Sequence, residues 1–466
     1  MFAALCPFLL LEFSLRVAGI PVSKVALDRD PLVDLHQLSP LFEIDEDPGQ
    51  YQIPDWRMNF FRPATFAVNK AANTKRIFVL GGSTVQGRPY ATETAFSTWL
   101  QLSLQAADSE TRFEVINCGG VSYASYRVAK ILDEVLQYSP DAIVICTGHN
   151  EFLEDRSYAA IRELGSVKKL ASQVGSNIQI VRWLQSFGDP VVHPDATVLQ
   201  REVNARLDHA NGMQAYNRDK HLHASVLQHF EVSVNRMLAA TKAAGVPTIL
   251  CVPASDVVNT PPFKSSVADD LSVADQDRFG QLSAESDQQT RSLRQRISAA
   301  QKAFLIDKEH AGINYLLAML MMENGDNAGA IDHFVLARDH DVCPLRAPSE
   351  FGDFVRRGAK KNGLPLIDIP RLFDSRSLSG ASEPDGIADA GLFADHIHPT
   401  IAGHQLIGQA LAKQFASMGW IEITPTSERT YQQNVRKQFE KLDESYFLRG
   451  KQRLEGLRNW AAGRAL

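Results

Sequence analysis

Five short apolar segments recur along the chain, each bounded by turn residues. They are rich in Val and Ile and lack regular polar alternation, which is typical of strands covered on both faces. The segments span residues 76–80, 113–117, 142–148, 247–253 and 364–369. Helical spacing follows the first segment at Phe96, Trp99, Leu100 and Leu104 and the second at Val128, Ile131, Leu132 and Val135. Alternating strands and helices predict a three-layer α/β/α domain with a five-stranded parallel sheet.

Two stretches interrupt this alternation. Residues 152–228 carry amphipathic segments, and we expect a helical insertion that covers one end of the sheet. Residues 260–347 begin with a polar, acidic loop and end in helices, and residues 314–337 have the spacing of a helix-turn-helix pair similar to one tetratricopeptide unit. One such unit cannot bury its apolar face alone. We therefore expect a hairpin docked on the main domain rather than a peptide-binding array, with a surface that could receive a protein partner.

The two ends of the chain differ from the central residues 71–425, which hold the predicted sheet. Residues 1–70 form an N-terminal arm whose first apolar run is interrupted by Glu12 and Arg16. A membrane-spanning helix needs about 20 apolar residues, so we interpret the run as a remnant of a membrane anchor or export signal. An apolar arm packed on the domain is the alternative. The anchor interpretation predicts membrane association through the N-terminus and an extracytoplasmic or membrane-anchored location, rather than a soluble cytoplasmic one.

Residues 426–466 form a charged tail with helical patterning. Its predicted docking stripe consists of Tyr446, Leu448, Leu454, Leu457 and Trp460. We expect this stripe to hold the tail against the main domain, because large apolar side chains gain free energy when they leave water.

Net charge argues against nucleic-acid binding, and cysteine spacing argues against a disulfide or zinc framework. The chain is 44% hydrophobic and 22% charged with a net charge of −6, so it offers no basic surface for nucleic acid. Its five cysteines are widely spaced and include no C-x-x-C pair, which argues against a disulfide framework and a zinc site. We expect the cysteines to be small buried hydrophobic residues.

Polar residues follow the apolar segments where a ligand would bind. In open parallel sheets, ligands bind beyond the carboxyl ends of the strands. The first segment leads into Gly81-Gly82-Ser83, the second into residues 117–120 and the third into residues 148–151. After the last segment, the stretch "FADHIHPT" presents Asp395, His396 and His398. A serine, an amide side chain and an Asp-x-x-His unit should therefore meet at one edge of the sheet.

Two other chemistries for these residues are disfavoured. A phosphate-binding loop needs a lysine after its last glycine, but Gly87 is followed by Arg88 and Pro89. A metal site could use Asp395, His396, His398 and His404, yet no further ligands with recognisable spacing accompany them. We expect neither a metal nor another cofactor.

Acyl transfer by serine would use the serine, the amide side chain and the Asp-x-x-His unit together. A serine hydroxyl becomes a nucleophile when a histidine takes its proton, and a carboxylate must orient that histidine. Asp395 and His398 are close enough in sequence to be hydrogen-bonded neighbours. Backbone amides at a strand-to-helix turn, together with an amide side chain, can hold the developing oxyanion.

These four blocks resemble those of the SGNH (GDSL-type) hydrolases. The blocks are "GGST", "VINCGGVSYAS", "GHNE" and "DHIHP", in the order of that family. The strings "FRPATFAVNKAANTKRIFVLGGSTVQGRPY" and "TGHNEFLEDRSY" are also similar to a bacterial subgroup that carries tetratricopeptide-like helices. The resemblance implies a flavodoxin-like parallel sheet, the SGNH hydrolase fold. It also implies Ser83 as nucleophile, His398 as general base, Asp395 as its orienting partner and Asn150 as an oxyanion donor.

Two positions depart from the family pattern. Gly82 stands where the family has an aspartate, and Ser122 stands where the second block has a glycine, with Gly120 two residues earlier. The Ser83 amide and an amide from the second block would complete the oxyanion hole, and the sequence leaves Gly120 and Ser122 both open as that donor.

Further residues are weaker candidates for substrate contacts. They are Gly82, Tyr123, His149, Glu151 and Arg346. His396 alternates with His398, and we expect it to face away from Ser83. The sequence thus predicts a serine esterase acting on a small-molecule or saccharide ester. An O-acyltransferase that uses the same site is the alternative, and a non-catalytic binding scaffold with the same fold is a third hypothesis.

Overall fold

A five-stranded parallel sheet forms the centre of the structure. The computed structural model describes residues 39–45, 49–154, 202–374 and 387–461. The strands are β4 (Thr74–Gly81), β5 (Arg112–Gly119), β6 (Ala142–Cys146), β7 (Thr248–Val252) and β8 (Leu366–Asp368). They lie in the order β5-β4-β6-β7-β8, and all neighbouring pairs are parallel. This is the 2-1-3-4-5 order of flavodoxin-like sheets, so the predicted fold class is confirmed.

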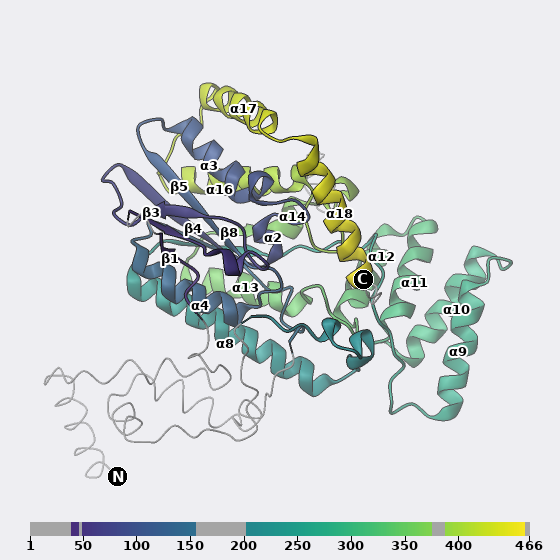
Figure 1. Cartoon of the computed structure of the whole chain (residues 1–466). Helices are drawn as coiled ribbons and strands as arrows, with labels where there is room; N and C mark the ends of the chain where they lie inside the picture. The colour runs from purple at the N-terminus through teal and green to yellow at the C-terminus, as the bar shows by residue number, and fades with distance from the viewer. Residues whose placement is uncertain (1–38, 46–48, 155–201, 375–386, 462–466) are drawn as a thin grey trace, which may run out of the picture.

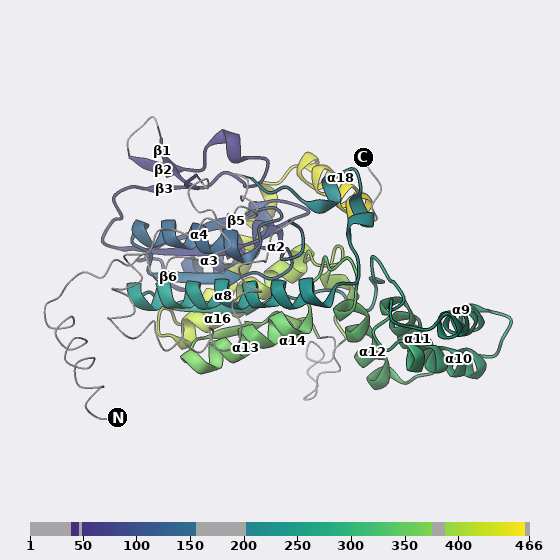
Figure 2. The same ribbon diagram turned by 90° about the horizontal axis from the view of Figure 1, so that it is seen from below.

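Helices cover both faces of the sheet (Figures 1 and 2). One face carries α3 (Phe96–Ala107) and α16 (Ile401–Ser417), and the other carries α4 (Ser125–Val135), α8 (Lys220–Ala244) and α13 (Ser349–Asn362). Strand β4 serves both layers, because successive side chains of a strand point to opposite faces. Its Ile77 and Val79 pack with α3 and α16, whereas Phe78 and Leu80 pack with α4 and α8. The continuous apolar run 77–80 of β4 is thus explained by burial on both sides.

Short helical turns complete the domain. The α-helical ones are α2 (Ser83–Gln86) and α14 (Ile369–Leu372). The 3-10 turns are η3 (Asp55–Arg57), η4 (Thr92–Thr94), η5 (Leu136–Tyr138), η6 (Arg206–Asp208), η7 (Gly212–Ala215) and η8 (Ala390–Leu392). Helix α2 starts directly after β4 and is the turn that presents Ser83.

Part of the predicted N-terminal arm is a small antiparallel sheet. Strands β1 (Glu43–Ile44), β2 (Gln50–Gln52) and β3 (Thr65–Ala67) pair in that order. Phe66 of β3 packs edge-on against Phe78 of the central sheet, with ring centroids 5.3 Å apart. The apolar run with the predicted anchor lies outside the described residues. Within the described ranges, no helix is both long and apolar enough to cross a membrane.

The first predicted insertion, residues 152–228, overlaps a helix of the main domain. Residues 155–201 lie outside the described residues. Helix α8 begins at Lys220 with its N-cap Asp219 and continues to Ala244, so it crosses the predicted boundary at residue 228. The predicted boundary misses this helix because the buried face of α8 begins before residue 228, at Ser225 and Val226.

The second insertion contains two helical hairpins rather than one. They consist of α9 (Val273–Asp287), α10 (Leu293–Ile306), α11 (Ala311–Glu323) and α12 (Asn327–Asp339). The predicted helix-turn-helix is present as α11 and α12, and its N-cap Asp326 accepts a hydrogen bond from the Gly329 amide. Leu317 of α11 packs with Phe279 and Ala300 of the other hairpin in a separate core. The likeness to a tetratricopeptide unit remains a prediction.

The tail forms α17 (Pro425–Glu440) and α18 (Glu444–Ala461). Figure 1 shows α17 beside α3 and α18 crossing the edge of the domain. Tyr446 is buried, and its hydroxyl lies 2.8 Å from Thr94 Oγ1. Leu448, predicted to dock, is 57% exposed, so that prediction is wrong. Two positions from Tyr446 on a helix, it lies on a different face.

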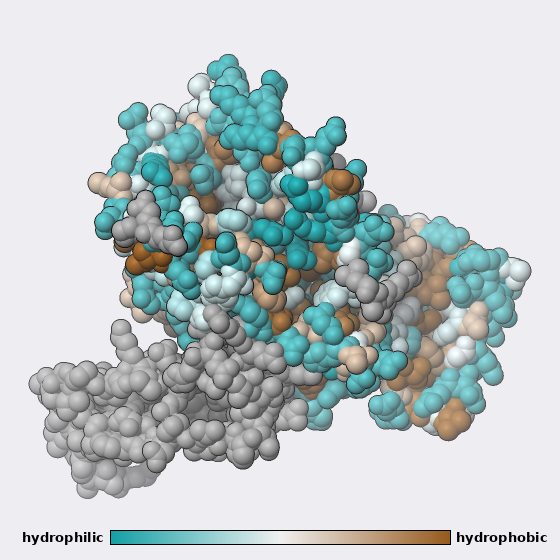
Figure 3. All heavy atoms as spheres, in the orientation of Figure 1, coloured by the Kyte–Doolittle hydropathy of each residue, from teal (hydrophilic) through white to brown (hydrophobic). Residues whose placement is uncertain are grey.

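The cysteines of the described residues are buried, and part of the insertion surface is apolar. Cys118, Cys146, Cys251 and Cys343 are buried free thiols, as expected, and Cys6 lies outside the described residues. On the face shown in Figure 3, hydrophilic side chains cover α17, and hydrophobic ones gather over the insertion α9–α12. Within this insertion, Val273 of α9 and Leu305 of α10 are exposed apolar side chains, with 75% and 67% of their area exposed.

Candidate active site

Ser83 stands at the turn between β4 and α2. Gly81 lies against the Cys146 backbone, and a Cβ on Gly82 would lie 2.7 Å from Asn150 Nδ2. A Cβ at Gly81 would overlap the Cys146 carbonyl, whereas one at Gly82 would require the Asn150 side chain to shift. Ser83 is the first residue of α2, where a backbone N–H has no partner within the helix. The turn thus places both the hydroxyl and the amide of Ser83 at the carboxyl end of the sheet.

His398 joins Ser83 to Asp395. Its Nε2 lies 2.8 Å from Ser83 Oγ, and its Nδ1 lies 2.7 Å from Asp395 Oδ2. The amides of Ile397 and His398 also donate to Asp395 Oδ1, at 3.0 and 2.8 Å. This backbone turn fixes the carboxylate before α16 begins at Ile401. The structure therefore brings the three predicted residues into one hydrogen-bonded chain.

The carboxylate in this chain is held in its ionised form. Burial alone would raise the pKa of Asp395, but the charges of His398 and His396 and the hydrogen bonds it accepts lower that pKa well below its usual value. His396 is also buried, and burial lowers its pKa to about 4, so this ring is neutral at neutral pH. One fixed negative charge thus faces the His398 ring on the side away from Ser83.

Asn150 and Ser122 lie beside Ser83. The Asn150 side chain is oriented by a 3.0 Å hydrogen bond from Nδ2 to the Tyr123 carbonyl. Ser122 has a φ of 62°, in the left-handed region that favours glycine. Its amide has no hydrogen-bond acceptor among the described residues, whereas the Gly120 amide donates to the Gly81 carbonyl at 3.0 Å. Of the two amides that the sequence left open, only that of Ser122 is available to a ligand.

A pocket of about 330 Å³ opens over these groups. Its lining includes Ser83, Ser122, Asn150 and His398, and the rest of the lining is mainly apolar. The remaining members are Phe60, Arg88, Val121, Leu153, Asp208, Leu345, His396, Ile397, Arg453, Gly456, Leu457 and Trp460. The Ser83 hydroxyl is therefore accessible to a small ligand although the residue is 6% exposed.

Helix α18 forms one wall of this pocket. It contributes Arg453, Gly456, Leu457 and Trp460, and Trp460 Nε1 donates to Asp208 at 2.7 Å. Leu457 and Trp460 belong to the predicted docking stripe, but nothing in the sequence indicated that the stripe would dock beside Ser83. Arg88 was also missed as a lining residue, because the sequence offered it only as evidence against a phosphate loop.

Two of the weaker substrate-binding candidates support the site from behind. Tyr123 holds Asn150 through its carbonyl, and its hydroxyl accepts from Arg57 at 2.9 Å. Glu151 accepts hydrogen bonds from the Ser125 amide and hydroxyl at 2.7 and 2.8 Å. Neither side chain is in the lining of the Ser83 pocket, since both are buried against α4 and its surroundings.

Three further candidates, Gly82, His149 and Arg346, also lie outside the lining. His149 Nδ1 accepts from the Ala347 amide at 3.1 Å, and burial lowers the His149 pKa to about 3. Arg346 is buried, and its guanidinium donates to the Thr260 and Asp256 carbonyls. His149 and Arg346 join loops beyond the carboxyl edge of the sheet and do not face the space above Ser83.

His396 is placed differently from its prediction. His396 was expected to face away from Ser83, but it lines the same pocket and packs edge-on against Phe263, with centroids 5.0 Å apart. His404 is fully buried and stacks on Phe96. Within the described ranges, no group of three or more His, Cys, Asp or Glu residues could hold a metal.

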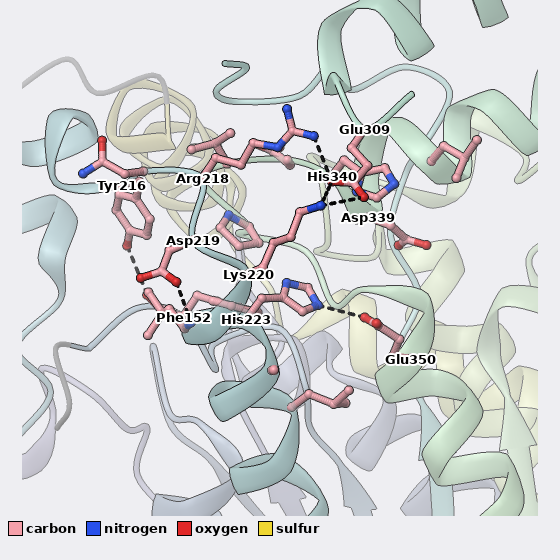
Figure 4. Close-up of a pocket in the computed structure, with 18 of the residues that line it drawn as sticks. Phe152, Tyr216, Arg218, Asp219, Lys220, His223, Glu309, Asp339, His340 and Glu350 are labelled. Carbon is pink, nitrogen blue, oxygen red and sulfur yellow. Dashed lines mark hydrogen bonds and ion pairs between the residues drawn. The ribbon is translucent and has the colours of Figure 1, made fainter. Parts of the chain in front are cut away.

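A second pocket, of about 410 Å³, lies where the insertion meets the start of α8 (Figure 4). Its charged side chains pair with one another. Arg218 contacts Glu309 at 2.8 Å, Lys220 contacts the same carboxylate at 2.8 Å, and His223 contacts Glu350 at 2.9 Å. These pairs join the insertion and α13 to α8, so the groups serve contacts between elements.

Solved structures with a similar arrangement are known, at low similarity. One is described as a lipolytic protein of the G-D-S-L family from Desulfitobacterium hafniense DCB-2, with 12% identity, a TM-score of 0.32, and coverage of 73% of this chain and 98% of that one. The acetyl xylan esterase AlAXEase has 12% identity and a TM-score of 0.34, with coverages of 73% and 98%. Axe2, an acetylxylan esterase from Geobacillus stearothermophilus, has 13% identity and a TM-score of 0.32, with coverages of 75% and 97%.

These values are too low to say what the chain acts on. No family model and no curated protein matches the chain. The functional conclusion therefore depends on the site itself.

Proposed function

We propose that the protein is a serine ester hydrolase that works through an acyl-enzyme at Ser83. The observation that carries this proposal is the continuous hydrogen-bonded chain from Ser83 through His398 to Asp395, beneath an accessible pocket. The same residues carry the resemblance to the SGNH hydrolases. The similar solved structures are described as esterases, but the proposal does not depend on them because their similarity to this chain is too low.

The proposed reaction begins with proton transfer. His398 Nε2 takes the proton of Ser83 Oγ as that oxygen attacks the ester carbonyl carbon. Asp395 keeps the His398 ring oriented and stabilises its positive charge. The tetrahedral oxyanion then accepts hydrogen bonds from the Ser83 and Ser122 amides and from Asn150 Nδ2, which lie around the same pocket.

The intermediate collapses when the carbon–oxygen bond to the alcohol breaks. His398 gives its proton to the leaving alkoxide, and the acyl group remains on Ser83. Water then enters, loses a proton to His398 and attacks the acyl carbon. As the bond to Ser83 Oγ breaks, His398 gives that proton to Oγ, which releases a carboxylic acid and restores Ser83. The expected substrate is a small-molecule or saccharide ester that fits a pocket of about 330 Å³.

Covalent labelling tests this proposal. A fluorophosphonate probe should modify the wild type, and peptide mass spectrometry should place the adduct on Ser83. Ser83→Ala should not be labelled, whereas Ser417→Ala, at an exposed position on α16, should be labelled like the wild type. Failure of the folded wild type to react would refute the proposal and leave the binding-scaffold hypothesis.

Transfer to an alcohol would use the same acyl-enzyme. The two outcomes can be separated by incubating the protein with an activated acetyl ester in the presence and absence of a polysaccharide. Acetate as the sole product supports hydrolysis. Acetylated polymer would show that an acceptor alcohol displaces the acyl group before water does.

A further inference from the structure

Three arginines surround one side of the Ser83 pocket. Arg88 and Arg453 line the pocket together with Ser83 and His398. Arg62 lies close enough for its charge to act on both of them. The three come from separate segments: Arg62 lies before β3, Arg88 follows α2, and Arg453 is on α18. The fold therefore gathers three positive charges that are far apart in the sequence.

These guanidinium groups have few partners of their own. Within the described ranges, no carboxylate forms an ion pair with Arg62, Arg88 or Arg453, although many other arginines of the protein are paired. The Nε atoms of Arg62 and Arg88 are buried and make no hydrogen bond. Arg453 donates from Nη1 to the Tyr90 carbonyl at 2.9 Å. A ligand could therefore satisfy several of these donors at once.

Neighbouring acidic groups do not neutralise this cluster. Asp395 acts on Arg88 from a distance, but its carboxylate is already engaged by His398. Glu93 acts on Arg62 and is exposed to solvent. Asp208 also lines the pocket, is exposed, and accepts a hydrogen bond from Trp460. Among the charged side chains that line the pocket, the two arginines Arg88 and Arg453 outnumber the one carboxylate, that of Asp208.

The cluster is electrostatically costly without a ligand. Burial, followed by the charges of Arg62 and Arg453, lowers the pKa of Arg88 to about 10. Burial and the Arg453 charge also lower the pKa of Arg62. Guanidinium groups carry a positive charge, so the mutual repulsion within this cluster persists until an anion enters.

We propose that the pocket selects esters that carry an oxyanion, such as a carboxylate or a sulfonate, which Arg88 and Arg453 bind directly while Arg62 adds its charge. This inference rests on the proposed function and extends it to the class of substrate. A guanidinium presents parallel N–H donors that match two oxygens of such a group. The apolar side chains of Phe60, Leu457 and Trp460 would cover the uncharged part of the ester.

Matched pairs of model esters test the selectivity. In the first series, 4-acetoxybenzoate and 4-acetoxybenzenesulfonate carry the charge on the alcohol side of the ester. They are compared with the neutral 4-acetoxybenzamide. Mono-4-nitrophenyl glutarate is compared with its methyl ester, which places the charge on the acyl side. Each kcat/KM is divided by the spontaneous hydrolysis rate of the same ester. In at least one series, we expect the wild type to prefer the anionic ester about tenfold or more, because hydrogen bonds to charged groups are strong.

Arginine variants assign that preference to the cluster. Arg453→Gln is the primary variant, since the residue is only partly buried, and Arg88→Gln is the second. Each should reduce the anionic-to-neutral ratio of kcat/KM by about tenfold, and Arg453→Lys should fall between Arg453→Gln and the wild type. Arg449→Gln is the matched control, because Arg449 is exposed on the same helix and contacts Ser445. Its ratio should equal that of the wild type.

A binding measurement tests the preference for an anion without requiring catalysis. Isothermal titration of Ser83→Ala with 4-hydroxybenzoate should give weaker binding after Arg453→Gln is added, and the affinity should fall as salt is raised. Hydrolysis of the neutral esters with no anionic preference in either series would overturn the inference and leave the proposed function standing. Absence of both fluorophosphonate labelling and ester hydrolysis would instead reject the proposed function, and the inference with it.

Discussion

At the residue scale, two backbone positions organise the space above Ser83. Ser122 adopts a left-handed conformation in which glycine is usual, at the position where the SGNH hydrolases that the sequence resembles have a glycine. Gly120 donates its amide to Gly81, which leaves the Ser122 amide as the second-block donor in the proposed mechanism. A serine at this position costs some backbone strain but retains the N–H that the oxyanion would need.

Gly82 gives the first prediction at this scale. In Gly82→Ala, the new Cβ would lie 2.7 Å from Asn150 Nδ2 and displace that side chain. Because an oxyanion donor contributes a factor of about 10²–10³, we expect kcat for an activated ester to fall roughly 100-fold with a smaller change in KM. Gly280→Ala, which has open space around it on α9, is the control and should keep full activity. An unchanged kcat in Gly82→Ala would contradict the assigned role of Asn150.

Buried histidines give the second prediction, which concerns pH. Burial lowers the pKa of His396 to about 4 and that of His404 to about 3, below the usual value of about 6.5. Between the usual pKa and each lowered pKa, the unfolded chain binds a proton at that histidine that the folded chain does not. The histidines therefore contribute stability that is fully present above about pH 6.5 and is lost as the pH falls. We expect urea unfolding to show a lower free energy at pH 5 than at pH 7.5.

His404 alone should account for a measurable part of that loss. At pH 5 its contribution is about 2 kcal/mol, from a gap of roughly 1.5 pH units below the unfolded pKa. His404→Leu should reduce the difference between pH 7.5 and pH 5 by about this amount. His221→Leu, at an exposed position on α8, should retain the wild-type difference. Equal pH dependence in all three proteins would show that His404 is not neutral in the folded state.

The chain Ser83–His398–Asp395 illustrates what a sequence can reveal at this scale. Each block has a short spacing and follows an apolar segment, so its place at the edge of the sheet could be predicted. His396 could not be placed in the same way, because alternation along an extended segment does not specify how the loop packs. The ring lines the pocket since it packs against Phe263, which belongs to a distant loop.

At the element scale, α18 is the feature that sequence patterns described least well. Its apolar stripe predicted that the helix would dock, but not which surface would receive it. The position is set by contacts with residues far away in sequence, such as Tyr446 with Thr94 and Tyr90. In contrast, the central strands were predictable because each one is a short segment rich in apolar residues and bounded by turn residues, a pattern that local sequence carries.

Two glycines in α18 allow a matched test of its docking. A Cβ on Gly450 would overlap the Tyr90 ring, whereas a Cβ on Gly456 would meet nothing within 4 Å. Alanine favours a helix over glycine by about 1 kcal/mol, so Gly456→Ala should raise the thermal midpoint slightly. Gly450→Ala has the same helical gain but must displace Tyr90, and we expect a lower midpoint. Limited proteolysis near residues 441–443 should also be faster in Gly450→Ala. A rise in both midpoints would show that α18 does not depend on this close contact.

At the scale of the whole molecule, a few ion pairs connect the helical insertion to the main domain. Arg218, just before α8, contacts Asp307 at 2.7 Å, at the end of α10. The Asp307 side chain is 3% exposed and also accepts from the Ala268 amide at 3.0 Å. The neighbouring pair between Lys220 and Glu309 is more exposed, with 74% of the lysine side chain accessible.

These two pairs should differ in importance. Arg218→Met leaves the buried Asp307 carboxylate without its cation, and we expect a loss of about 3 kcal/mol in the stability of the insertion. Lys220→Met should cost less than about 1 kcal/mol, because exposed pairs contribute little. Hydrogen exchange of amides in α9–α12, measured against those of the central sheet, reports the difference. Similar exchange in both variants would contradict the role of Arg218.

The distance along the chain between Ser83 and His398 has a consequence for folding kinetics. The hydrogen bond between them joins residues 315 positions apart, and the pocket wall from α18 lies still later in the chain. Local helices can form early, but contacts between residues this distant must wait until the intervening chain is ordered. Recovery of the proposed esterase activity after dilution from urea should therefore lag behind recovery of helical circular dichroism, so that the Ser83 pocket reports a late stage of folding.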